Sequence, residues 1–166
     1  TYSCAPSPIQ WAAIKAYESV ESLNQYLSLQ QRILKRFGTF AAESLRAAGV
    51  RCYDPVGGFY IMPDFEQLRG ALRENGIENS QQLCQQILKD TGVAVLPGSA
   101  FGFADNYLVV RLAFVDFDGQ SILDAIEQYG DSIIDQDDFI EKYANKVYDG
   151  MIKLSKWASV REVVTN

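Results

Sequence analysis

The feature that most constrains the fold is the apolar run NYLVVRLAFV, residues 106–115, which contains a single arginine, Arg111. Side chains alternate along a β-strand, so odd-numbered residues 107–115 would share one face and even-numbered residues 108–114 the other. Apart from Arg111, both sets are almost entirely apolar. We therefore expect a strand in the middle of a sheet, covered on both faces, with a guanidinium group inside it.

Arg111 requires a compensating anion in such a place. An uncompensated charge in an apolar interior costs several kcal/mol, so the guanidinium must pair with an acceptor of negative charge. Two kinds of anion satisfy this requirement: an Asp or Glu of the same chain, or a carboxylate or phosphate of a ligand. On charge alone the structural ion pair is favoured, because buried arginines more often pair within their own protein.

Composition excludes several classes of protein. A chain of 166 residues with 48% hydrophobic content is sufficient for one domain with its own core. The net charge of -6, with scattered basic residues, argues against nucleic acid as a partner, because a phosphate backbone requires a basic surface. No apolar run approaches the ~20 residues that cross a bilayer, and no signal-peptide pattern is present, so we expect no membrane partner.

The supply of catalytic and metal-binding side chains is also restricted. Histidine is absent, so general acid–base chemistry would have to proceed without imidazole. The three cysteines, Cys4, Cys52 and Cys84, are far apart and lack CxxC spacing, which predicts neither a disulfide framework nor a metal site. This cysteine usage favours a reducing, cytoplasmic location.

Helical and extended patterns alternate along the chain. Apolar spacing of three and four predicts helices at 9–20, 23–48, 65–75, 80–91 and 118–130, with Gly38 as a weak point and Gly49 as a stop. Aromatic and β-branched residues predict extended segments at 50–55, 57–62, 93–98 and 106–115. The short connections between strands favour an α+β domain, a small mostly antiparallel sheet covered by helices.

The segment DDFIEKYANKVYDGMIKLSKWA, residues 137–158, has an apolar seam of heptad type. The seam consists of Ile140, Ala144, Val147, Met151, Leu154 and Ala158. It predicts a helix that packs on its own domain, with a dimer-forming helix as the alternative. The acidic residues of DSIIDQDD, 131–138, are expected to cap this helix and to face solvent.

Five segments carry a resemblance to a known family: SPIQWAAIKAY, LRAAGV, PVGGFYIMPDF, TGVAVLPGSAFG and YLVVRLAF, in this order. Together they resemble the C-terminal small domain of class I/II aminotransferases, enzymes that depend on pyridoxal phosphate. The resemblance runs from about Ser3 to about Ile126 and implies the fold of the C-terminal subdomain of pyridoxal phosphate-dependent transferases. In that family the arginine of the RLAF strand binds the substrate α-carboxylate. The resemblance therefore implies that Arg111 is a substrate-binding residue.

The resemblance also implies what lies outside these residues. The family's Schiff-base lysine and phosphate-binding residues belong to an N-terminal large domain, and no segment here matches them. We therefore expect residues 1–166 to be a single C-terminal small domain, inactive alone and without catalytic, cofactor-binding or metal residues, in which 131–166 form an extra helical tail. Lys156, in LSKWASVR, is the best candidate among the lysines, but we expect it to be a solvated surface residue. The implied full-length enzyme is a homodimer that binds pyridoxal phosphate, an amino acid and a 2-oxo acid.

Residues near the arginine also have simpler interpretations. Gly57 and Gly58 are expected to form a turn, and the loop 97–101 is expected to supply turn chemistry between strands. Phe59 and Tyr60 are expected to be core residues rather than substrate contacts. For the chain as a whole, the alternative function is a non-catalytic aminotransferase-like binding or regulatory module.

Overall fold

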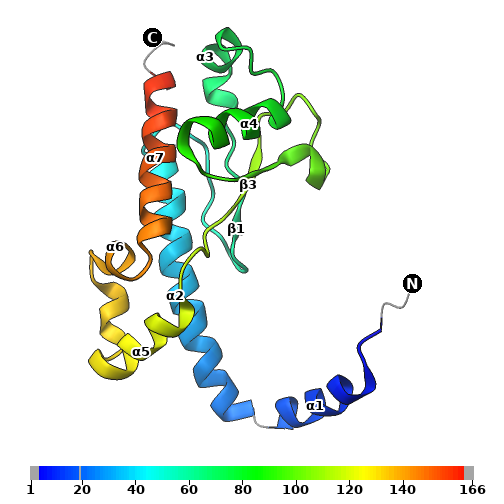
Figure 1. Ribbon diagram of the computed structural model, residues 1–166, viewed down its shortest axis with the longest axis vertical. Coiled ribbons are helices and arrows are strands. Elements are labelled where there is room, and N and C mark those ends of the chain that lie inside the picture. Colours follow the sequence, from blue (N-terminus) through cyan, green and yellow to red (C-terminus); the bar gives the residue numbers. More distant parts are fainter. Residues whose placement is uncertain (1–3, 19, 163–166) are drawn as a thin grey trace. The chain divides into compact units, whose positions relative to one another are not determined.

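The computed structural model describes residues 4–18 and 20–162 (Figure 1). The chain separates into two compact units, Thr1–Ile33 and Leu34–Asn166. The helices are α1 (Ser7–Glu18), α2 (Val20–Arg46), α3 (Arg69–Glu74), α4 (Ser80–Thr91), α5 (Gly119–Tyr129), α6 (Phe139–Tyr143) and α7 (Asn145–Glu162). Three short 3-10 helices are η1 (Glu66–Leu68), η2 (Gly98–Phe101) and η3 (Asp131–Asp135), and the strands are β1 (Tyr60–Ile61), β2 (Leu96–Pro97) and β3 (Val110–Ala113).

The first unit is helical. Helix α1 confirms the helix predicted at the start of the chain, but no described residue in it is buried. Its large apolar side chains Ile9, Trp11, Ile14 and Tyr17 are each at least half exposed. The apolar spacing of this segment therefore predicts the helix correctly, but the apolar side chains are not part of a buried core.

Helix α2 continues from the first unit into the second, where it contributes to the core. Phe37, Ala41 and Leu45 have no exposed surface, which confirms the predicted apolar face. The helix is continuous through Gly38, so the expected weak point is wrong. A Cβ at Gly38 would lie 2.4 Å from Cγ of Pro55, which means that the missing side chain allows the helix to pack closely.

The sheet of the second unit has the strand order β1-β3-β2, and both pairings are antiparallel. Tyr60 pairs with Ala113 on one side of β3, and Leu96 pairs with Arg111 on the other. This small antiparallel sheet among helices confirms the α+β class predicted from the sequence.

The predicted strand at 50–55 is wrong. Only an isolated bridge forms there, between Arg51 and Asp64. The carbonyl oxygen of Cys52 accepts a hydrogen bond from Nη1 of Arg46 at 3.0 Å, so a side chain takes the place of a ladder partner. The other extended segments do contain strands, but these are only two to four residues long.

The two faces of β3 have different environments, which corrects the expectation that both are covered. The even-numbered side chains Leu108, Val110, Leu112 and Phe114 are all at most 3% exposed. On the other face Val109 is buried, Arg111 is half-buried and Ala113 is exposed. One face of the strand therefore belongs to the core, and the other opens to the surface at Arg111 and Ala113.

The C-terminal segment is divided into η3, α6 and α7 instead of forming the single predicted helix. At Ala144 the backbone leaves the helical region, with φ -146° and ψ 51°. Phe139 of α6 contacts Phe37 at 5.9 Å between ring centroids, and α7 begins after the break as a separate helix. Asp138 precedes α6 but makes no side-chain capping bond, so the predicted capping role is wrong for that residue.

All six residues of the predicted seam, from Ile140 to Ala158, are buried within the second unit. Helix α7 packs against α4 and α6, and Figure 1 shows it beside the second half of α2, where Phe40 and Tyr148 stack at 5.7 Å. The prediction that this segment packs on its own domain is confirmed. Over the described residues, no helix combines the length and apolar character required to cross a membrane.

Trp157 and Arg161 near the end of α7 bind Asp90 near the end of α4, and we call this contact the polar latch. Nε1 of Trp157 donates a hydrogen bond to Oδ2 of Asp90 at 2.7 Å. The Arg161 guanidinium lies 3.8 Å from the Trp157 ring centroid and 3.3 Å from the same carboxylate oxygen. Hydrogen bonds from Gln86 and then from Trp157 hold the pKa of Asp90 below its usual range, so the carboxylate stays charged in the latch.

Candidate functional site

The central strand places Arg111 on the open face of the sheet. Arg111 lies in β3, which is paired on both sides, and it stands opposite Leu96 of β2. The backbone at this position is therefore fixed by hydrogen bonding, while the half-buried side chain reaches the surface. A rigid strand that presents a side chain to an open surface is a suitable scaffold for a binding residue.

Two aromatic rings contact the guanidinium of Arg111. Its Cζ atom lies 4.2 Å from the ring centroid of Tyr60 and 4.0 Å from that of Phe101. Both distances are well within the range of cation–π interaction. The side chains of Tyr60 and Phe101 are 40% and 39% exposed, so the cluster borders solvent.

Arg111 has no acidic partner among residues 4–18 and 20–162. Five other arginines of the second unit differ in this respect, because each forms an ion pair with a carboxylate at 2.6 to 3.7 Å. These are Arg46, Arg51, Arg69, Arg73 and Arg161. The structural ion pair favoured on charge alone is therefore not formed within the described chain, and the donor groups of Arg111 remain available to a ligand.

The positions of Phe59 and Tyr60 correct the expectation that they are core residues. Each is 40% exposed, and their rings contact each other at 4.3 Å between centroids. The preceding Gly57 and Gly58 form a bend, as expected, and Gly58 has a φ of 68°. A Cβ at either glycine would meet no atom within 4 Å, so no close packing within the chain requires them.

A second polar group lies near the start of β3. The Tyr107 hydroxyl donates a hydrogen bond to Oδ2 of Asp64 at 3.1 Å, and Arg51 pairs with the same oxygen at 3.1 Å. The hydrogen bond to Asp64 raises the pKa of Tyr107, because the carboxylate favours the protonated phenol. These groups satisfy one another, so they connect segments of the fold and leave no free charge.

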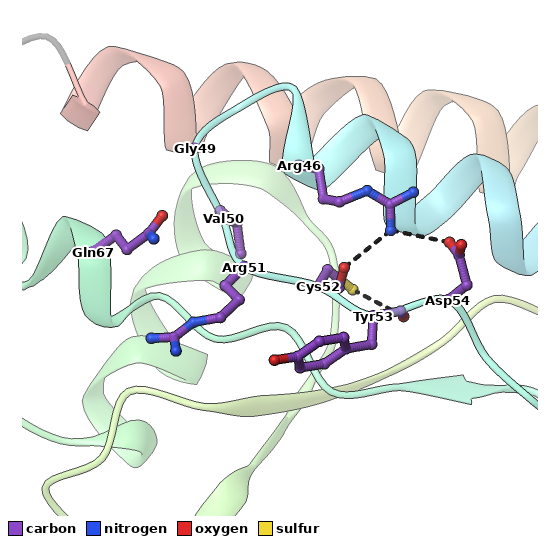
Figure 2. Close-up of a pocket in the computed structure, with 8 residues that line it drawn as sticks. All are labelled: Arg46, Gly49, Val50, Arg51, Cys52, Tyr53, Asp54 and Gln67. Atoms are coloured by element: carbon purple, nitrogen blue, oxygen red, sulfur yellow. Dashed lines mark hydrogen bonds and ion pairs between the residues drawn. The ribbon is translucent and has the colours of Figure 1, made fainter.

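A hollow of about 450 Å³ lies beside the turn after α2 (Figure 2). Nη1 of Arg46 donates to both the carbonyl oxygen of Cys52 and Oδ1 of Asp54 at 3.0 Å. Burial raises the pKa of the Cys52 thiol to about 11, which keeps it protonated and unreactive near neutral pH.

A larger groove of about 630 Å³ lies between the segment 91–94, the end of β3 and helix α7. Apolar side chains line most of it, and Lys146 and Asp116 form an ion pair at 3.5 Å at its edge. Arg111 is not among the lining residues. Across the described part of the chain, no group of three or more His, Cys, Asp or Glu residues could hold a metal ion.

The family profile described as aminotransferase class I and II matches residues 1–118. The chain belongs to this family. A probable aspartate/prephenate aminotransferase of Rhizobium leguminosarum is 31% identical over 110 residues, which cover 64% of this chain and 27% of that protein. The aspartate aminotransferase of Thermotoga maritima is 33% identical over 117 residues, 69% of this chain and 25% of that protein. The chain thus spans about a quarter of the length of these relatives.

Solved structures extend the comparison of the aminotransferase fold over nearly the whole chain. The aromatic aminotransferase of Pyrococcus horikoshii superimposes with a TM-score of 0.60 at 22% identity, covering 93% of this chain and 32% of that one. Its agreement supports the C-terminal subdomain fold, including helices beyond residue 118.

Full-length members of the aminotransferase family use pyridoxal phosphate, but the lysines of this chain do not fit that cofactor. The resemblance implies a Schiff-base lysine in another domain, and all seven lysines here are exposed. Lys156 lies on the exposed side of α7, which confirms its prediction as a surface residue. No step of the reaction is therefore assigned to a lysine of this chain.

Sequence reasoning missed the aromatic partners of Arg111. The sequence predicts structural roles for both, Tyr60 in the core and Phe101 in a turn. The signal was present in the pairing of β1 with β3, because Tyr60 opposite Ala113 shares the face of Arg111. Only the register could reveal this, and the register is not readable from strands of two residues.

Proposed function

We propose that this chain is the C-terminal small domain of a pyridoxal phosphate-dependent aminotransferase, in which Arg111 binds the α-carboxylate of an amino acid or 2-oxo acid. In this proposal an N-terminal large domain of the same protein supplies the cofactor and its lysine, and the chain alone is inactive. The complete enzyme is a cytoplasmic homodimer, as the family resemblance implies.

The observation that carries the proposal is the state of Arg111. Its guanidinium lies over two rings at 4.0 and 4.2 Å and pairs with no carboxylate of the described chain. A planar group with parallel N–H donors matches a carboxylate in two simultaneous hydrogen bonds, which a lysine could not form. An arginine held at an open face without a partner is therefore equipped for such a ligand.

The contribution of Arg111 to the reaction is orientation. Two hydrogen bonds to one carboxylate fix the position and the plane of that group, which restricts how the rest of the substrate can be placed. Orientation of this kind lowers the entropic part of the barrier, so loss of the contact reduces turnover as well as binding. The half-buried setting strengthens the contact by limiting competition from water.

The test uses the longer protein that contains these residues. Steady-state kinetics with an amino acid and a 2-oxo acid are expected to show that Arg111→Leu lowers kcat/KM by about 10²-fold or more. Arg73→Leu is the matched control, because Arg73 is an exposed surface arginine paired with Glu78 at 3.7 Å. Its kinetics should equal those of the parent protein.

Normal turnover by Arg111→Leu would refute the binding role of Arg111. A longer protein without transamination of any amino acid tested, but with the fold intact, would instead favour a non-catalytic module.

A further inference from the structure

We propose that Tyr60 and Phe101 are positioning residues that hold the guanidinium of Arg111 in the orientation required for carboxylate binding. This inference rests on the proposed function of Arg111 and adds the two residues through which its geometry is set. It starts from the contacts of the Arg111 Cζ atom with the two ring centroids, 4.2 Å and 4.0 Å.

Tyr60 reaches Arg111 through the register of the sheet. Tyr60 of β1 stands opposite Ala113 of β3, which places it diagonally across from Arg111 on the same face. Diagonal neighbours on antiparallel strands are within reach of aromatic and long side chains. Backbone pairing therefore determines this contact.

Phe101 reaches the guanidinium from η2, the short helix that follows β2. The amide of Gly98 donates to the carbonyl oxygen of Val109 at 2.8 Å, which brings the start of η2 against β3. A Cβ on Gly98 would lie 2.8 Å from that same oxygen, so only glycine allows this approach. At the other end Gly102, with φ 88°, closes the turn after Phe101.

The two rings come from separate elements, Tyr60 from β1 and Phe101 from η2. The guanidinium contacts both of them. Both rings lie against the centre of the guanidinium, and neither offers it a charged acceptor, so its N–H donors have no ionic partner among the described residues. Because these rings carry no ionised group, they fix the arginine without neutralising it, which an aspartate partner would do.

Nuclear magnetic resonance of the 166-residue chain tests the positioning directly. The Nε–H proton of Arg111 should be displaced by the ring currents of both rings, relative to that of exposed Arg73. Tyr60→Leu and Phe101→Leu should each move the Arg111 resonance toward the Arg73 position. Tyr60→Phe and Phe101→Tyr keep a ring and should retain the parental resonance.

The kinetic test uses the longer protein. Each leucine variant should raise KM for both the amino acid and the 2-oxo acid and lower kcat/KM by about tenfold, because one cation–π contact is lost. The ring-retaining variants should restore the parental values. Urea unfolding of every variant verifies that it is folded. Where a leucine variant fails to fold, Tyr60→Met or Phe101→Met replaces it, which keeps apolar volume without a ring.

The outcomes separate this inference from the proposed function. If folded leucine or methionine variants keep the parental Arg111 resonance and kinetics while Arg111→Leu loses activity, Arg111 binds the carboxylate and the positioning role is wrong. If the ring variants move the Arg111 resonance but Arg111→Leu is fully active, the proposed binding role fails on its own. Loss of both the resonance shift and activity, with rescue by the conservative variants, supports the inference.

Discussion

At the scale of single residues, Arg111 differs from the arginines that form ion pairs in the described chain. Arg69 exemplifies the ion-paired arginines, since it binds Glu66 through two hydrogen bonds of 2.6 and 2.7 Å and also reaches the carbonyl oxygen of Asn106. Glu66 in turn accepts from the amide of Leu108, and its hydrogen bond from Arg69 lowers its pKa. Arg111 has neither kind of partner and contacts only rings among the interactions of the described chain.

This difference predicts how each arginine affects stability. Arg111→Leu should change the free energy of unfolding by less than about 1 kcal/mol, because leucine still packs on both rings and no carboxylate loses its partner. A buried ion pair broken at this site would instead cost ~3 to 5 kcal/mol. Urea denaturation of the 166-residue chain measures the change.

The matched control is Arg69→Leu, which leaves Glu66 without its main partner. We expect it to destabilise the chain on the order of 1 kcal/mol or more. A larger loss from Arg111→Leu than from Arg69→Leu would show that Arg111 is a structural residue.

At the scale of elements, long periodic segments could be predicted and short ones could not. The bounds of α4 match the prediction because Asn79 caps its first turn and Gly92 ends it with a φ of 75°, both local signals. The break at Ala144 has no such signal, since the apolar seam passes through it unchanged. The contact between Phe139 and Phe37 that accompanies the break joins residues far apart in the sequence, so no local pattern could indicate it.

The candidate site shows the same limit. Arg111 could be found because a charge within an apolar strand is visible in the sequence itself. Its setting could not, because the exposure of Tyr60 depends on which face of β1 the core covers. Two-residue strands carry too little alternation to decide that question.

The latch between α4 and α7 should contribute measurably to stability. Trp157→Phe keeps a buried ring but removes the N–H group that donates to Asp90, so we expect a loss of about 1–2 kcal/mol in urea unfolding. Trp11→Phe is the control, because Trp11 is 72% exposed and its replacement should change stability by less than about 0.5 kcal/mol.

The pH dependence gives a further check on the same latch. The folded-state pKa of Asp90 is lowered, so its contribution is present above the ordinary carboxyl pKa and is lost as the pH falls through the folded value. The difference between the parent chain and Trp157→Phe should therefore shrink in strong acid. An equal difference at all pH values would contradict the latch.

At the scale of the whole molecule, the exposed lysines predict how the chain reacts with pyridoxal phosphate. With no lysine in a protected setting, borohydride reduction after mixing should modify several lysines partially. Peptide mass spectrometry measures the distribution, and the chain unfolded in urea is the reference for uniform reactivity. A single stoichiometric adduct on one lysine of the folded chain would contradict the assignment of the cofactor to another domain.

The unequal faces of β3 have a consequence for how this protein can diverge. Leu108, Val110, Leu112 and Phe114 hold the core, and Arg111 with its neighbours on the other face meets the ligand in our proposal. In our proposal, side chains on opposite faces of one strand therefore serve folding and ligand recognition. Substitutions at Arg111 and Ala113 could change ligand recognition without removing a core side chain.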